Sequence, residues 1–168
     1  MTENLSGLPD VQTSRLRLSP LRVEDAGALQ AFSDRSEILD WIHFLPNPFG
    51  VADAEALIRA KGDGRDRFVG LGLREEETLI GVLGVHLQGE ARLEIGYWLD
   101  PARHGQGYVT EAGRGVLAFV TGLFPHRQVV AHALPTNQRS LRVLEKLGFR
   151  PADEAASRPD RNLFILAR

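Results

Sequence analysis

Residues 93–112 read LEIGYWLDPARHGQGYVTEA, and this stretch decides the fold of the chain. A strand-like run from Leu93 to Leu99 leads into it, and a helix-like run from about Val109 to Leu123 leads out. Two glycines, Gly105 and Gly107, lie at the junction. A glycine-rich turn that opens a helix exposes backbone N–H groups, and the helix dipole adds positive potential there. The stretch therefore predicts a phosphate or pyrophosphate site formed by the main chain.

Two better-known phosphate motifs do not fit this turn. The dinucleotide-binding fingerprint requires a third glycine three residues after Gly107, where this chain has Thr110. The Gly-Lys-Ser/Thr signature of a P-loop is absent from the sequence. Two glycines alone could also serve only as a tight connection. We therefore expect a pyrophosphate held by the N–H groups of about His104 to Thr110, with Arg103 nearby.

Composition excludes several classes of protein. The chain has 168 residues, 43% of them hydrophobic and 25% charged, with a formal net charge of -2 and no cysteine. A weak net charge disfavours nucleic-acid and membrane partners, and the lack of cysteine excludes disulfides and thiolate catalysis. The five histidines show no metal-binding spacing, so no metal site is expected. We expect one domain over residues 1–168, with residues 1–10 as a loose lead without a signal peptide, in the cytoplasm.

Hydrophobic periodicity gives a mixed order of elements. Strands are expected at residues 15–21, 68–73, 79–87, 92–99, 128–134 and 161–167. Helices are expected at residues 23–32, 36–44, 51–61 and 109–123, and a last one runs to Leu147 with Thr136 or Asn137 as its cap and Gly148 after it. Short polar links at 74–78 and 88–91 suit hairpins. The pattern predicts a mixed α/β plan around one central sheet.

Two passages together resemble a known family. Residues 93–112 resemble motif A of the GCN5-related N-acetyltransferases (GNAT), and residues 133–149, ALPTNQRSLRVLEKLGF, resemble motif B. Residues 13–18, TSRLRL, are similar to the first strand of the RimJ/RimL-like branch. The resemblance implies the α/β GNAT fold: a single mixed, mostly antiparallel sheet of six to seven strands, flanked by helices and splayed near Trp98 and Val130.

The resemblance also implies acetyl-CoA as the cofactor. The backbone of Trp98 and Leu99 would pair with the pantetheine arm, and Asn137 would face the cofactor. The pyrophosphate would be held by His104, Gly105, Gln106, Gly107, Tyr108, Val109 and Thr110. The family often has Gln or Arg at the position of Ala102, but a main-chain cradle does not depend on that side chain.

Glu94 and Ser140 are the candidate catalytic residues. Side chains two apart share one face of a strand, so Glu94, Gly96 and Trp98 point together and Glu94 could take a proton from an amine. Partial burial is expected to raise its pKa; the alternative is a solvent-facing carboxylate. Ser140 lies one helical turn after Asn137 and could protonate the leaving thiolate, or it could simply pack near the helix start.

Other hydroxyl and imidazole groups have weaker support. Leu144 occupies the position where many relatives have a tyrosine, so that mechanism does not transfer to this chain. Tyr97 and Tyr108 are further hydroxyl candidates, with Tyr97 expected in the core of the sheet. His132, on its predicted strand, could approach the acyl site.

The aromatic residues of segment 32–49 suggest an acceptor wall. Trp41 and Phe44 could shape the acceptor site, although a helix pair that packs on the sheet explains the same pattern.

The predicted function is acetyl transfer from acetyl-CoA to a primary amine in a ternary complex. The acceptor could be a protein N-terminus, a polyamine or a small-molecule amine, and the protein a monomer or homodimer. The alternative is a non-catalytic acyl-CoA-binding or regulatory domain on the same fold.

Overall fold

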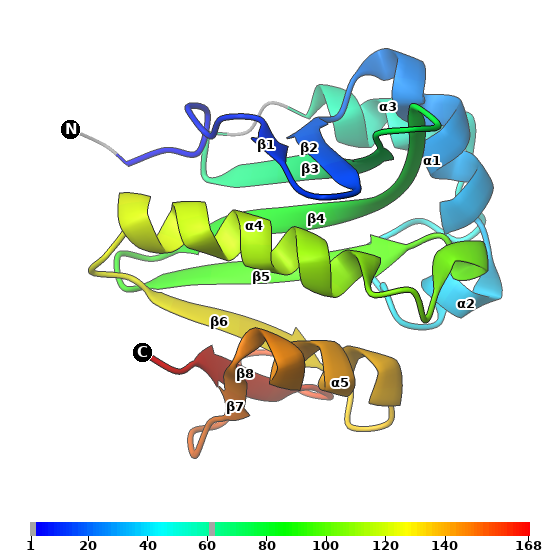
Figure 1. Ribbon diagram of the computed structural model, residues 1–168. Helices are drawn as coiled ribbons and strands as arrows, with labels where there is room; N and C mark the ends of the chain where they lie inside the picture. The colour runs from blue at the N-terminus through cyan, green and yellow to red at the C-terminus, as the bar shows by residue number, and fades with distance from the viewer. Residues whose placement is uncertain (1–2, 61–62) are drawn as a thin grey trace.

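The computed structural model describes residues 3–60 and 63–168, and within them one eight-stranded sheet forms the centre of the molecule (Figure 1). The strand order is β1-β2-β3-β4-β5-β6-β8-β7. The strands are β1 (Val11–Gln12), β2 (Leu16–Pro20), β3 (Asp66–Leu73), β4 (Thr78–Gln88), β5 (Arg92–Leu99), β6 (Gln128–Ala133), β7 (Phe149–Pro151) and β8 (Asn162–Leu166). All neighbouring pairs are antiparallel except β5 and β6.

Helices pack on both faces of the sheet (Figure 1). The helices are α1 (Ala26–Ser33), α2 (Ser36–Leu39), α3 (Val51–Arg59), α4 (Tyr108–Leu123) and α5 (Gln138–Leu147), with short 3-10 turns η1 (Val23–Asp25) and η2 (Pro101–Arg103). One buried cluster joins the sheet to α4 and α5, and a second joins it to α1, α2 and α3. The sheet therefore has an α4 face and an α1–α3 face.

Strand β5 contributes to both clusters by alternation of its side chains. Leu93 and Ile95 belong to the cluster on the α4 face, whereas Trp98 belongs to the cluster on the α1–α3 face. Glu94 is even-numbered like Trp98, so its side chain lies on the α1–α3 face. The alternation predicted from the sequence is confirmed.

The ladder between β5 and β6 is short. It pairs Arg92 with Gln128, Leu93 with Val129 and Glu94 with Val130, and it ends there. Beyond this point β5 stays paired with β4 as far as Leu99, while β6 continues along β8. The two parallel strands therefore diverge just after Glu94, which leaves one edge of the second half of β5 without a partner strand.

The six predicted strands all form, and the mixed, mostly antiparallel sheet is confirmed. The sheet has eight strands rather than six to seven because β1 and β7 add to its edges. These strands have only two and three residues. Runs of that length are too short to show an alternating pattern in the sequence.

Two expectations need correction. The helix expected at 36–44 ends at Leu39, and Phe44 lies outside it and packs against Phe68 and Trp98. The lead expected to be loose is partly docked: Leu5 is buried, and its N–H donates to the carbonyl of Gly64. Helix α3 ends at Arg59; its expected end at Lys61 lies outside the described residues.

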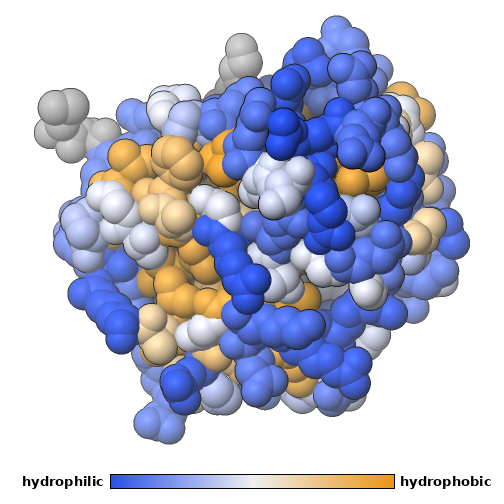
Figure 2. Space-filling view, in the orientation of Figure 1, coloured by the Kyte–Doolittle hydropathy of each residue, from blue (hydrophilic) through white to orange (hydrophobic). Residues whose placement is uncertain are grey.

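The surface over the α4 face is largely hydrophilic, as Figure 2 shows. Hydrophobic side chains are visible toward the left of that view, where the C-terminal half of α4 lies, and Phe119 and Leu123 of this half are exposed. None of the helices in the described part of the chain combines the length and apolar character that crossing a membrane requires.

Gly81 tests the packing of β4 against the end of β5. A Cβ at this position would lie 2.9 Å from the backbone oxygen of Trp98 and 2.9 Å from a methyl of Leu99. Because a strand backbone cannot move aside cheaply, Gly81→Ala should lower the free energy of unfolding by about 1–3 kcal/mol. Gly96→Ala on β5 is the control, since nothing lies within 4 Å of its added Cβ. Equal stability of both variants in urea would contradict this account.

Candidate active site

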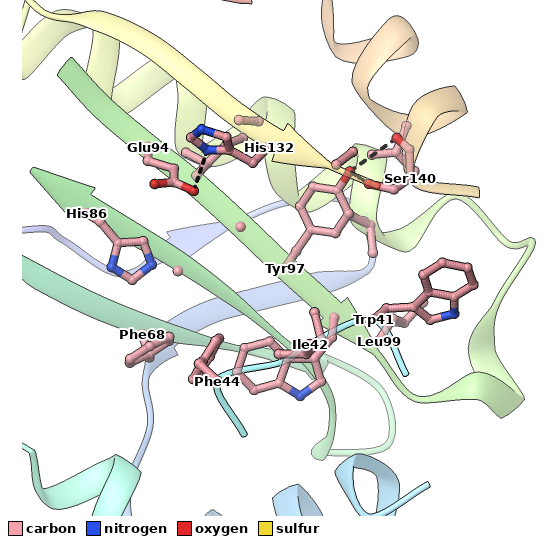
Figure 3. A pocket seen from close by; sticks show the side chains of 18 of the residues that line it. Trp41, Ile42, Phe44, Phe68, His86, Glu94, Tyr97, Leu99, His132 and Ser140 are labelled. Atoms are coloured by element: carbon pink, nitrogen blue, oxygen red, sulfur yellow. Dashed lines mark hydrogen bonds and ion pairs between the residues drawn. The ribbon is translucent and has the colours of Figure 1, made fainter. Parts of the chain in front are cut away.

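A single cleft of about 1370 Å³ brings the predicted site residues together. Residues of both faces line it, including the turn before α4, the start of α5, the divergent part of β5 and the segment after α2. Figure 3 shows side chains from these regions around the opening between the strands. The divergence of β5 and β6 thus joins a pocket on the α4 face to one on the α1–α3 face.

The turn before α4 carries unpaired amides. Gly105 and Gly107 have φ angles of 78° and 81°, which glycine adopts most easily. Gly107 precedes the first residue of α4 and provides no side-chain cap. Among residues 3–60 and 63–168, no protein acceptor is found for the backbone N–H groups from Gly105 to Thr110. A helix N-terminus with open amides suits an anion such as a diphosphate.

Most of the predicted cradle lines the cleft. The lining residues are His104, Gly105, Gly107, Tyr108, Val109 and Thr110. Gln106 is exposed and does not line it; its carbonyl accepts a hydrogen bond of 2.9 Å from Arg15 Nη1. The side chain of Gln106 is therefore not part of the cleft wall.

Arg15 fixes the turn to the rest of the molecule. Its Nε lies 2.7 Å from Glu111 Oε2, and its guanidinium lies 4.2 Å from the centre of the Tyr108 ring. Thr13 donates its hydroxyl to Glu111 at 2.6 Å. These contacts anchor both the turn and the first turn of α4, so the amides keep their direction.

Of Trp98 and Leu99, only Leu99 presents its backbone to the opening. The N–H of Asp100 binds Ile80 on β4, and backbone groups alternate in direction along a strand, so Trp98 also faces β4. The carbonyl of Leu99 accepts a hydrogen bond of 3.0 Å from His104 Nε2. Burial, followed by the charge of Arg139, lowers the pKa of His104. His104 is therefore a neutral donor beside the turn.

Glu94 is buried and surrounded by donors. Only 4% of the residue is exposed. His132 Nδ1 lies 3.0 Å from Oε1, Arg158 Nη2 lies 3.1 Å from the same oxygen, and Gln88 donates its amide to Oε2. Both carboxylate oxygens therefore have partners from other elements.

The pKa of Glu94 differs from the sequence-based expectation. Burial is the largest influence and acts to raise the pKa, but the hydrogen bond from His132 and the charges of Arg158 and His132 together outweigh it, so the pKa is lowered. The expected rise is therefore wrong. Glu94 is ionised at neutral pH.

His132 extends the site toward the surface. Its side chain is 2% exposed, and its Nε2 lies 3.2 Å from the hydroxyl of the exposed Ser157. The order Glu94, His132, Ser157 forms a chain of hydrogen bonds from the cleft to the outside. Alternation along β6 suggests that His132 points to the same face of the sheet as Glu94. The sequence does not show that β5 pairs with β6, and this pairing is what brings the two side chains together.

Tyr97 and Ser140 meet on the α4 face. Their hydroxyl oxygens are 2.9 Å apart, as Figure 3 marks. Burial raises the pKa of Tyr97 to about 12, against a smaller opposite effect of the Ser140 hydrogen bond. Asn137 caps α5 by accepting from the N–H of Ser140 at 3.1 Å, and it also lines the cleft. Tyr97, one of the further hydroxyl candidates, thus provides a partly buried, protonated hydroxyl at the cleft.

An aromatic cluster forms the wall on the α1–α3 face. Phe44 lies 6.1 Å from Phe68 and 5.8 Å from Trp98 between ring centres. Ser33 accepts the indole N–H of Trp98 at 2.9 Å, which fixes the ring. Trp41 and Phe44 both line the cleft, and Figure 3 shows Phe44 beside Phe68.

The comparisons with known proteins agree with this geometry. Residues 15–150 match the model of the acetyltransferase (GNAT) domain family. The chain belongs to the GNAT acetyltransferase family. It is similar to YnaD of Bacillus subtilis, an uncharacterised N-acetyltransferase, with 30% identity over 145 residues, which cover 83% of this chain and 82% of YnaD.

Solved structures share the fold. RimJ of Mycobacterium smegmatis, solved in complex with CoA-disulfide, aligns with a TM-score of 0.81 at 22% identity, over 98% of this chain and 90% of RimJ. An acetyltransferase of Agrobacterium tumefaciens aligns over the full length of both chains with a TM-score of 0.79 at 21% identity. The protein is therefore a GNAT acyltransferase, and the cofactor of this family is acetyl-CoA.

The ionisation of Glu94 predicts an acid-dependent loss of stability. Its folded pKa lies below the ordinary value of 4.5, so the unfolded chain binds the proton more tightly. The stabilising contribution is present above about pH 5 and is lost as the pH falls through the folded pKa. The free energy of unfolding should therefore fall less steeply between about pH 5 and pH 3 in Glu94→Gln than in the wild type. The same change at exposed Glu75 is the control, and identical slopes for Glu94→Gln and the wild type would refute the assignment.

Proposed function

We propose that this enzyme transfers the acetyl group of acetyl-CoA to a primary amine by direct attack in a ternary complex. One observation carries the proposal: a single cleft runs through the divergence of β5 and β6, with open amides on one face and the buried Glu94–His132 pair on the other. This arrangement would let two reactants approach from opposite faces and meet beside β5.

The α4 face fits the cofactor. The amides from Gly105 to Thr110 would hold the diphosphate, and the pantetheine arm would run along the unpaired edge of β5, where, in the described part of the chain, the Leu99 carbonyl is bound by His104 and the Leu99 N–H is free. Asn137 would contact the cofactor from the start of α5. When bound there, acetyl-CoA supplies an activated thioester carbonyl, and the N–H of Leu99 is placed to polarise its oxygen.

Glu94 would remove the proton from the amine, directly or through a water. The attacking species would be the neutral amine, because an ammonium ion has no lone pair. Glu94 has a lowered pKa and is a weak base, but the nitrogen becomes strongly acidic as its new bond to the acetyl carbon forms. A carboxylate that His132 and Arg158 keep ionised is therefore a strong enough base to accept this proton. Ser157 links the far nitrogen of His132 to the outside, which gives the proton an exit.

Tyr97 would donate the proton to the leaving sulfur. It lies on the cofactor face, and its raised pKa of about 12 keeps it protonated. Its hydrogen bond with Ser140 orients the hydroxyl, so Ser140 acts with Tyr97 rather than alone. This pair would take the role of the tyrosine that many relatives have at the position of Leu144.

Replacement of the tyrosine hydroxyl separates binding from catalysis. Tyr97→Phe should lower kcat by about 10²-fold, because the general acid is lost, while the Kd of acetyl-CoA changes little. Ser140→Ala should have a smaller effect on kcat, because Tyr97 remains. Stopped-flow thiol release and calorimetry measure the two quantities. A wild-type kcat in Tyr97→Phe would exclude Tyr97 as the acid.

Thiol release with a panel of amines tests the proposed function itself. Wild-type protein with acetyl-CoA and a suitable primary amine should release free CoA and form the N-acetyl product by mass spectrometry. The double variant Glu94→Gln with Ser140→Ala should still bind acetyl-CoA but turn over at least about 10²-fold more slowly. Tight cofactor binding without turnover on any amine would instead favour a regulatory domain.

A further inference from the structure

The charges around Glu94 leave an excess of positive charge on the acceptor side of the cleft. Arg158 and Arg161 both line it, and Arg158 lies 3.1 Å from Glu94. The two other carboxylates that line the cleft have partners of their own: Glu37 pairs with Arg35, and Asp66 Oδ1 lies 2.7 Å from His86 Nδ1. Among the groups that line the cleft, Glu94 is therefore the carboxylate that faces Arg158 and Arg161; Asp160, which lies outside the lining, also acts on Arg161.

Arg161 is held at the junction of two segments. Its Nη2 donates to the carbonyl of Trp41 at 2.6 Å, and neighbouring Asp160 lies 3.8 Å from His43. The loop before β8 thus meets the segment after α2 at the cleft. Arg161 therefore lies next to Trp41, another residue that lines the cleft.

The aromatic wall is open to the cleft. Phe44 is 56% exposed although it contacts Phe68 and Trp98, so one side of this large ring faces the space rather than the core. An exposed apolar surface of this kind in a cleft suits an apolar group of a ligand. Trp41 also lines the cleft.

We propose that the amine acceptor is a free α-amino acid with a large apolar side chain. The inference rests on the proposed acetyl transfer. The α-carboxylate would bind Arg158 and Arg161, the amine would face Glu94, and the side chain would cover Phe44 and Phe68. A guanidinium binds a carboxylate through paired N–H groups, which fixes its orientation.

The pair of arginines explains why a simple amine fits less well. An ammonium ion without a carboxylate would meet two cations and one anion, whereas an amino acid brings the second anion with it. In the reaction, the amine nitrogen bonds to the acetyl carbon and the C–S bond breaks. Starting from the neutral amine, Glu94 takes the proton that the nitrogen loses, and the sulfur receives the proton of Tyr97.

A matched set of amines tests this assignment. L-phenylalanine, L-phenylalanine amide and phenethylamine share the aromatic group and differ in the carboxylate, and a peptide with N-terminal serine represents a protein terminus. By thiol release, kcat/KM should be at least about tenfold higher for phenylalanine than for the amide, phenethylamine or the peptide. Product mass confirms N-acetylation.

The arginine variants locate the carboxylate site. In the double variant Arg158→Gln with Arg161→Gln, the ratio of kcat/KM for phenylalanine to that for phenethylamine should fall at least tenfold. Arg150→Gln, an exposed residue of β7, is the control and should keep the wild-type ratio. Use of this ratio removes any loss of kcat/KM that affects both amines equally, such as one caused by a displacement of the Glu94 side chain.

The outcomes separate the two proposals. Preference for phenethylamine or the peptide over phenylalanine, or an unchanged ratio in the double arginine variant, overturns the amino-acid assignment and leaves acetyl transfer intact. No thiol release with any amine, despite acetyl-CoA binding by calorimetry, overturns the proposed function itself.

Discussion

The end of the β5–β6 ladder at Glu94 and Val130 is the constraint on which the site depends. Parallel strands that stayed paired would close the sheet and separate its faces. Here β5 remains with β4 and β6 remains with β8, so the backbone edge at Leu99 stays open. The cleft, the two-faced lining and the proposed meeting of two reactants all follow from this divergence.

Electrostatics assign different tasks to the two faces. On the α4 face, main-chain amides offer positive potential without a titratable group, which suits a diphosphate at any physiological pH. On the other face, Glu94 is kept charged despite burial by His132 and Arg158. Tyr97 is the opposite case, because burial keeps it protonated. Neighbouring donors thus set the direction of the pKa shift of Glu94, whereas desolvation sets that of Tyr97.

Local patterns in the sequence predict the frame of this fold well. The glycine turn, the cap at Asn137 and the alternation on β5 are local signals, and all three take the expected form. Contacts between distant segments leave no such signal. The Tyr97–Ser140 pair joins residues 43 positions apart, and the Glu94–Arg158 pair spans 64, so both require the packed sheet. The expectation of a raised pKa for Glu94 was wrong for this reason: the groups that donate hydrogen bonds to its carboxylate come from other strands and loops.

Backbone amide NMR during titration with coenzyme A tests the central claim most directly. The account predicts that the N–H signals of Gly105 to Thr110 and of Leu99 shift together at the lowest ligand concentrations, because these amides contact the diphosphate and the arm. The signal of exposed Arg150 on β7 should stay in place. Shifts that omit residues 105–110, or a spectrum that coenzyme A leaves unchanged, would contradict it.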